Sequence, residues 1–272
     1  MTPHAALPYL TGFILSCWLV ALIGFLPPVA KRVRLPLGIT FFVLGWLLLV
    51  GYMAWMWIEL ERPPMRTMGE TRLWYSLLLP AVGLVLQWRW QAFKMAIMPI
   101  IIMVMSSVFL IKTALHPEMM DKTLMPALQS PWFVPHVLVY MVSYAIFGLA
   151  AALGVWTLAR EFFIKDGGCE RAAKDAHRLI AIGFPFLTAG LIFGALWGKV
   201  AWGHYWSWDP KETWAFLTWA MYLIYIHMKT YNRLSPRMHL CLLAGGFIIV
   251  LGCWFGVNSL PTSAQSVHTY TN

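Results

Sequence analysis

The chain carries little charge for its length. Only 11% of its 272 residues are charged and 60% are hydrophobic, whereas a soluble globular domain typically has about 25% charged residues. This composition excludes an ordinary soluble domain and predicts an integral membrane protein. The net charge of +9 does not indicate a nucleic-acid partner, because the lysines and arginines lie in short runs between apolar stretches.

Cysteine is also scarce. The four cysteines, at positions 17, 169, 241 and 253, form neither a CxxC pair nor a CxxCH haem-attachment sequence. They therefore predict no disulfide framework and no thiol redox motif, and we interpret them as buried structural thiols. Walker, GxGxxG, GxSxG and HExxH motifs are absent too, which leaves phosphate-binding, serine hydrolase and zincin chemistry without support.

Long apolar runs predict an all-α fold, a polytopic transmembrane bundle. A membrane helix needs about 20 mostly apolar residues, and eight stretches qualify, near 8–27, 36–58, 72–88, 95–112, 136–160, 179–198, 212–229 and 238–257. Their alternation places 13 of the 20 lysines and arginines on one side, which is predicted to be cytoplasmic. Both termini are then external. We expect residues 1–115 to form an N-terminal helical part and residues 116–272 the functional core.

The densest local feature is the tryptophan segment, "WGHYWSWDPKETWAFLTW" at residues 202–219, which holds five tryptophans. Isolated tryptophans usually mark the membrane interface. Trp202, Trp206 and Trp208, however, precede the predicted span in a stretch that glycine, serine and proline interrupt. We therefore expect a binding surface of flat rings, completed by Trp214, that suits a large planar ligand such as a porphyrin or a quinone head group.

The same segment contains residues that predict the start of the following helix. Asp209 is predicted to be the N-cap, Pro210 the first helical residue, and Glu212 the third residue of a capping box. Asp209 thus has a structural role whether or not it also contacts a ligand.

The stretch "WGHYWSWDPKETW" resembles the WWD signature of haem-handling proteins of cytochrome c maturation. It is most similar to the CcsA (ResC-type) subunit of the two-component cytochrome c synthase. "LQSPWFVPHVLVYMVSYAIF", "YLIYIH" and "GVNSLPTSAQSVHTY" extend the resemblance over about half to two-thirds of the chain. The resemblance implies a haem lyase that binds haem b (iron protoporphyrin IX) and attaches it to the CxxCH motif of apocytochrome c. It also implies a CcsB/ResB-type membrane partner, and we expect a bacterial plasma membrane rather than a thylakoid.

Three histidines are candidate haem ligands. The span parity places His136 and His268 on the external side with the tryptophan segment, and a pair of imidazoles makes a six-coordinate haem iron. The resemblance implies that these two are axial ligands; alternatively, His136 only begins a span and His268 is a solvated tail residue. His227 lies near the cytoplasmic end, where the resemblance implies a ligand of a second haem shared with the partner. A histidine there can also simply reach the interface.

The remaining polar residues have plainer interpretations. His4, His116, His177 and His239 are interpreted as loop or interface residues, and the acidic and basic side chains of 58–72 as a solvated external loop. His204 ranks below the three candidates as an iron ligand. Lys199 and Lys211 are placed to pair with haem propionates, or are ordinary surface lysines.

The predicted function is therefore to accept haem near His227, hold it externally between His136 and His268, and present it to apocytochrome c thiols. One alternative is a haem transporter or CcmC-type chaperone that delivers haem without attaching it. A second is a b-type electron-transfer subunit that handles quinone, which would require two stacked histidine pairs in one chain. A third, a purely structural membrane subunit, leaves the tryptophan segment unexplained.

Overall fold

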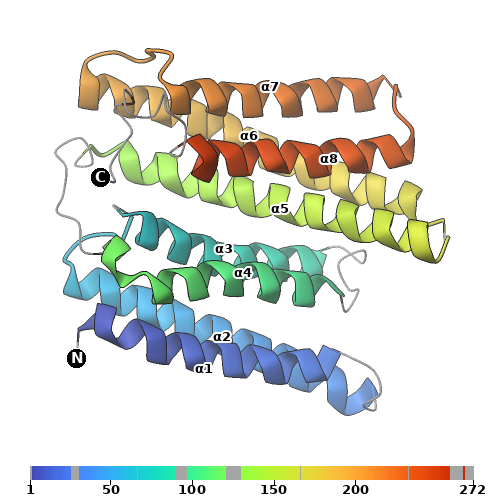
Figure 1. The fold of residues 1–272 in the computed structure, drawn as a ribbon, viewed down its shortest axis with the longest axis horizontal. Helices are drawn as coiled ribbons and strands as arrows, with labels where there is room; N and C mark the ends of the chain where they lie inside the picture. The colour runs from blue at the N-terminus through green and yellow to red at the C-terminus, as the bar shows by residue number, and fades with distance from the viewer. Residues whose placement is uncertain are drawn as a thin grey trace. The chain divides into compact units, whose positions relative to one another are not determined.

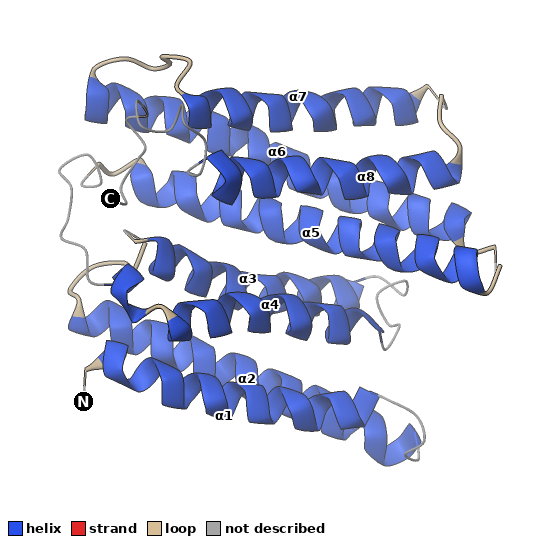
Figure 2. Ribbon diagram, in the orientation of Figure 1, coloured by secondary structure: helices blue, strands red, loops and turns tan. Residues whose placement is uncertain are grey.

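The computed structural model describes residues 2–25, 31–65, 67–89, 97–120, 130–165, 167–231, 233–257 and 266. Within these ranges, residues 31–35, 68, 86–89, 97, 117 and 119 are described by their backbone alone. The described parts of the chain consist of helices and their connections, with no strand among them (Figure 2). The predicted all-α class is confirmed.

The chain divides into two compact units, residues 1–124 and 125–272. The first contains α1 (Pro3–Phe25), α2 (Lys31–Glu59), α3 (Met68–Arg89), α4 (Ile97–Leu115) and the short 3-10 helix η2 (Pro117–Met120). In this unit α1 packs against α2 and α4, and α3 packs against α4 (Figure 1). The functional division predicted at residue 115 stays a prediction.

The second unit contains α5 (Phe133–Phe163), α6 (Cys169–Trp202), α7 (Pro210–Thr230), α8 (Pro236–Leu251) and a terminal π-helical turn, η4 (Gly252–Gly256). α5 and α7 begin at the end of this unit where α6 and α8 finish (Figure 1). We call this the loop end, because it carries the α6–α7 loop, residues 203–209. The opposite end, which carries the connections 164–168 and 231–235, is called the basic end.

Eight α-helices are thus found in the described residues, one for each predicted span. Six of them contain a stretch long and apolar enough to cross a membrane, and α3 and α7 do not reach that standard. The cause is in their sequences: α3 carries Glu70 and Arg72, and α7 carries Lys211, Glu212 and Lys229. The chain is a multi-pass helical membrane protein.

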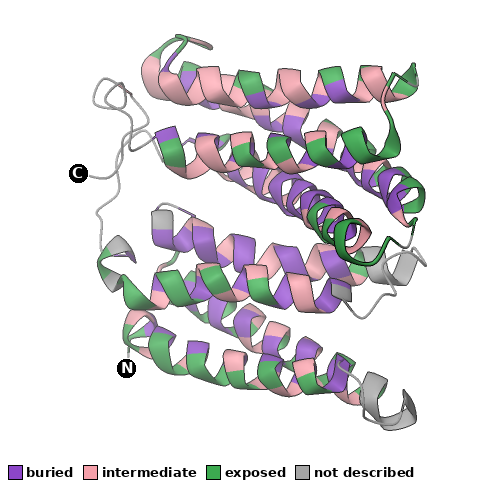
Figure 3. Ribbon diagram, turned by 45° about the vertical axis from the view of Figure 1, so that its right-hand side comes forward, coloured by how far each residue is buried: buried purple, intermediate pink, exposed green. Residues whose placement is uncertain are grey.

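The core of the second unit is α5. Of its most apolar stretch, 78% is buried, against 28% for α6, and the buried residues follow α5 along its length (Figure 3). It contacts α6 and α8. A helix apolar on all sides is expected to take such a central position.

Glycines of α6 allow α5 to approach closely. A Cβ atom added at Gly183 would lie 2.6 Å from the Phe147 ring, and one added at Gly190 would lie 2.9 Å from the Tyr140 ring. Small residues let membrane helices pack with their backbones close together. Ser143 completes the contact by donating a hydrogen bond from Oγ to the Gly183 carbonyl oxygen at 3.0 Å.

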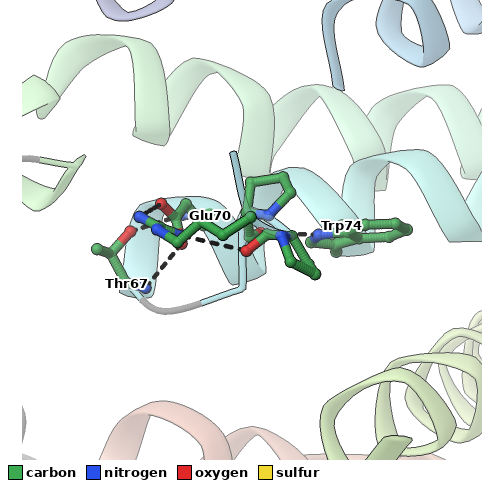
Figure 4. Close-up of polar contacts among 6 residues, drawn as sticks. Thr67, Glu70 and Trp74 are labelled. Carbon is green, nitrogen blue, oxygen red and sulfur yellow. Dashed lines mark hydrogen bonds and ion pairs between the residues drawn. The ribbon is translucent and has the colours of Figure 1, made fainter. Parts of the chain in front are cut away.

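The external loop predicted at 58–72 is not simply solvated, and this interpretation was wrong for Glu70. Its side chain is fully buried and accepts hydrogen bonds from Arg62, 2.8 Å from Nη2 to Oε1, and from the Thr67 backbone N–H at 3.1 Å (Figure 4). Thr67 Oγ1 accepts from the Glu70 N–H in return, which makes a capping box at the start of α3. Trp74 fixes the loop further by donating to the Pro64 carbonyl at 2.7 Å.

Candidate functional site

The proposed ligand His136 is held in a defined orientation at the loop end. Its Nδ1 lies 2.9 Å from the carbonyl oxygen of Gly190. A carbonyl can only accept a hydrogen bond, so Nδ1 carries the proton and the lone pair of the neutral ring is on Nε2. Fixing the tautomer through the second nitrogen is the usual way in which proteins orient a histidine that binds a metal.

A glycine makes room for this ring. A Cβ atom added at Gly194 would lie 2.8 Å from Cε1 and 2.9 Å from Nδ1 of His136. His136 therefore packs against a glycine of α6, as Phe147 and Tyr140 of α5 also do. His136, Tyr140 and Phe147 face Gly194, Gly190 and Gly183 in turn, and this reversed order along α6 is what antiparallel packing requires.

Aromatic side chains surround the same imidazole. The Tyr140 ring meets it edge-on with centroids 4.8 Å apart, and the Trp197 ring lies 5.5 Å away. Trp197 is 2% exposed and contacts Phe133 and Trp202 as well. Trp197 was not among the predicted site residues, although its position five residues before Trp202, in an apolar run, was a usable signal.

The end of α6 is shaped by Gly203 and Lys199. Gly203 has φ 84°, the left-handed conformation of a helix C-cap, and Lys199 donates from Nζ to the Gly203 carbonyl at 2.8 Å. The same ammonium group lies 5.5 Å from the centroid of the Tyr205 ring. Lys199 thus closes the helix end, a contact that neither sequence interpretation of this lysine included.

Trp208 has a strained backbone. Its φ is 59°, in the left-handed region, and its side chain is 63% exposed. A residue with a Cβ atom pays roughly 1–2 kcal/mol for this conformation. Strain of this kind persists only where the surroundings enforce it, and it is concentrated at functional positions.

Glu212 enforces the strain. Its Oε2 accepts hydrogen bonds from the backbone N–H of Ser207 at 2.8 Å and of Asp209 at 3.2 Å, on either side of Trp208. Thr213 Oγ1 donates to the Trp208 carbonyl at 3.1 Å. With Asp209 as N-cap and Pro210 at the first position, this is a full capping box. The predicted start of α7 is confirmed, and the box also presents one indole to the surroundings.

The indole rings do not lie in one plane. Trp202 packs against Trp197 at 61°, and Trp206 packs against Trp208 at 85°. Trp208 also meets Phe216 edge-on, and a Cβ atom at Gly252 would contact the Trp214 ring. These rings therefore stand edge to face, and a binding surface formed by them is not a single plane.

Trp206 offers a hydrogen-bond donor. Its indole Nε1 is buried and has no acceptor among the described residues. Buried donors are nearly always satisfied by protein, water or a ligand. An acceptor group of a bound molecule would meet this requirement.

Asp209 connects the loop to the C-terminal tail. It is 8% exposed, and its Oδ1 accepts from the Lys211 backbone N–H at 2.9 Å and from Ser266 Oγ at 3.0 Å. Ser266 precedes His268 by two residues in the sequence. His268 itself lies outside the described residues.

His227 lies far along α7 from this loop, toward the basic end. It is exposed, and its Nδ1 donates to the Leu223 carbonyl one turn earlier, at 2.9 Å. The lone pair is again on Nε2. The structure thus brings His136, the tryptophans and Asp209 to the loop end and leaves His227 apart from them.

The other histidines divide into two groups. His116 is exposed and bonded to Glu118 at 2.8 Å, as a loop residue would be. His239 is 1% exposed within α8, and His177 is half-buried within α6. His239 is therefore not an exposed loop residue, because the start of α8 packs into the unit. Cys241 similarly corrects the cysteine prediction, since its side chain is exposed.

The fold and its membrane-spanning helices define a class, the polytopic helical membrane proteins. Within it, the model of the family described as Cytochrome C assembly protein matches residues 7–264. The chain belongs to this family, and the predicted relation to CcsA-type cytochrome c biogenesis proteins is confirmed.

Three named relatives are called Cytochrome c biogenesis protein CcsA. The chain is 40% identical to the CcsA protein of Chlamydomonas reinhardtii over 154 residues, an alignment that covers 54% of this chain and 42% of the relative. It is 34% identical to that of Atropa belladonna over 183 residues, 55% and 59% of the two chains. It is 29% identical to that of Heterosigma akashiwo over 267 residues, 82% and 81% of the two chains. The matches thus span about half the length of the first two relatives.

A solved structure has the same fold. It is described as Cytochrome c Heme Lyase CcmF, with a TM-score of 0.63 and 15% identity. The likeness covers 94% of this chain and 51% of the other. At this identity the comparison concerns the fold alone.

Proposed function

We propose that this protein is the haem-presenting subunit of a cytochrome c synthase. The observation that carries the proposal is the seat of His136: its Nδ1 is fixed by the Gly190 carbonyl, and its ring is enclosed by Tyr140 and Trp197. In a cytochrome c biogenesis protein, an imidazole oriented in this way suits an axial ligand of haem iron. The substrate is haem b, bound by His136 through Nε2.

His268 is proposed as the second axial ligand at the loop end. The hydrogen bond between Ser266 and Asp209 supports this pairing, because it attaches the tail to the residue that begins α7. The exposed ring of Trp208 and the indole N–H of Trp206 are proposed to contact the porphyrin and one of its propionates. Trp202 and Trp214 complete the haem-binding set.

For the attachment of haem to apocytochrome c, the chain has only to hold the two reactants in the right orientation. Each thiol of the apocytochrome CxxCH motif adds across a haem vinyl group: a C–S bond forms, the thiol proton ends on the other vinyl carbon, and no electrons are gained or lost. Holding both reactants in one geometry is worth several kcal/mol of barrier. No residue of this chain is needed as an acid or base, and none is proposed.

The loop end is proposed to be external, because 13 of the 20 lysines and arginines fall on the other side in the predicted topology. The membrane is proposed to be a bacterial plasma membrane. At the basic end, His227 is proposed to bind a second haem together with a histidine of a CcsB/ResB-type partner. Its exposure on α7 supports a ligand shared with another chain.

The test uses the protein co-expressed with its partner. His136→Ala should remove the bis-histidine absorption spectrum of the external haem and abolish cytochrome c assembly. His204→Ala, a change of an exposed histidine in the same loop region, is the matched control and should leave both intact. Unchanged spectrum and assembly in His136→Ala would refute the proposal.

The cytochrome c assembly assay also distinguishes the proposed synthase from a haem transporter. A transporter or chaperone would deliver haem to the external face, and holocytochrome would then form only when a separate lyase is supplied. The proposed synthase forms the thioether bonds without one. For the second haem, His227→Ala should lower the haem content of the complex, and full content would exclude that site.

A further inference from the structure

Ring residues of three helices lie toward the basic end of the second unit. This inner cluster consists of His177 on α6, Tyr222 and Tyr225 on α7, and His239 on α8. The ring centroids of His177 and Tyr225 are 6.0 Å apart, and those of Tyr225 and His239 are 5.6 Å apart. Tyr222, Tyr225 and His239 are at most 1% exposed. Three helices therefore contribute polar side chains to one enclosed place.

The polar atoms of the inner cluster lack partners. Nδ1 of His177, both ring nitrogens of His239, and the hydroxyls of Tyr222 and Tyr225 are buried without a hydrogen bond among the described residues. Buried polar groups are satisfied by protein or by a bound molecule in the great majority of cases. Several such atoms in one cluster indicate a ligand that both donates and accepts hydrogen bonds.

The geometry and charge restrict what this ligand is. Ring separations of 5.6 and 6.0 Å are direct contacts, so a porphyrin or quinone ring does not fit between them. Lys229, one turn beyond Tyr225, acts electrostatically on both imidazoles, and its positive charge opposes a metal cation. Water is small and neutral, and it forms two to four hydrogen bonds with groups such as neutral imidazole and phenol.

We propose that the inner cluster is a buried water site, in which bound water links the imidazoles of His177 and His239 to the hydroxyls of Tyr222 and Tyr225. The water then joins α6, α7 and α8 toward the basic end. This site does not depend on the proposed haem function, because none of the four residues belongs to the haem-binding set.

Radiolytic labelling in H2¹⁸O tests the site directly in the full chain, because hydroxyl radicals formed from a bound water modify the side chains next to it. Tyr225 should take up ¹⁸O much faster than Phe42, which is 2% exposed in an apolar environment. His239→Phe should slow the labelling of Tyr225. Labelling of Tyr225 no faster than that of Phe42 would overturn the proposal.

Stability gives a second, independent measurement. If water bridges the cluster, Tyr225→Phe and His239→Phe should each lower the melting midpoint by a few degrees. The double variant should lose less than the sum, because both changes remove the same bridge. If the cluster is dry, Tyr225→Phe removes an unpaired hydroxyl and the midpoint stays or rises. Tyr231→Phe, at an exposed tyrosine, is the control and should change nothing. A stoichiometric metal in the purified protein would also overturn the assignment of water.

Discussion

Two capping boxes begin helices in the described part of the chain, and they have different roles. In the box of α3, Glu70 is fully buried and its carboxylate is shared between Thr67 and Arg62 (Figure 4). In the box of α7, Glu212 binds the backbone on both sides of an exposed and strained Trp208. The same local motif closes a loop in the first unit, and presents an aromatic ring in the second.

This difference predicts that the α3 box contributes mainly to stability and the α7 box mainly to activity. The α3 box uses its acid to neutralise a cation in a buried place, so its removal affects folding. The α7 box stores strain at the proposed haem site, so its removal should affect function more than folding.

The largest effect on stability is expected from Arg62→Ala. The substitution removes a cation that pairs with the buried Glu70 carboxylate, and breaking a buried pair in this way costs about 3–5 kcal/mol. Thermal unfolding of the purified protein measures the loss. Lys174→Ala, which breaks an exposed pair with Glu170, should cost under about 0.5 kcal/mol. Equal losses in the two variants would mean that the burial of Glu70 has no energetic role.

Glu212→Ala is expected to lower activity more than stability. Loss of the box should cost roughly 0.5–2 kcal/mol of stability, but cytochrome c assembly per folded molecule should fall at least about tenfold, the equivalent of 1.4 kcal/mol in an activation barrier. Glu212→Gln keeps one acceptor oxygen and should recover most of the assembly. Activity that declined only in proportion to the folded protein would leave the loop without a special role.

Trp208→Gly isolates the strain. Glycine adopts a φ of 59° at little steric cost, so this variant should be as stable as the parent or more stable, by up to about 1–2 kcal/mol. Assembly should nevertheless fall, because the exposed ring is gone, and Trp208→Phe should retain more of it. A stable Trp208→Gly variant with full assembly would show that the indole is not used.

Ser266→Ala should have the smallest effect on global stability, because it acts on the tail alone. It removes one hydrogen bond to the Asp209 carboxylate, worth about 1.5–3 kcal/mol to the tail at most. Limited proteolysis should cut the tail faster, with the midpoint of global unfolding unchanged. Ser266→Thr keeps the hydroxyl and should behave as the parent. Identical digestion of all three proteins would remove the support for a tail attached through Asp209.

The sequence was sufficient for features that depend on near neighbours. The eight helices follow from apolar runs, and the α7 box follows from the spacing of Asp209, Pro210 and Glu212, because all its hydrogen bonds are made within a few residues. The thirteen-residue WWD stretch likewise led to the family. These features need no knowledge of how helices pack.

Features that depend on packing register could not be predicted. Gly194 faces His136 rather than another residue only because α5 and α6 are aligned in one particular way. The burial of His239 depends on α8 packing against α5, α6 and α7, and the pairing of Arg62 with Glu70 joins residues on opposite sides of two prolines. A single sequence gives no measure of these alignments.

The length of α6 sets the depth of the inner cluster. Its 34 residues span about 51 Å, well beyond a hydrocarbon layer of about 30 Å. The excess belongs to its first ten residues, "CERAAKDAHR", where polar side chains predominate. We therefore expect these first residues to lie in the lipid headgroup layer, with His177 at the border of that layer. Water of the proposed site would then reach the cluster by crossing the headgroups alone, without passing through the lipid tails.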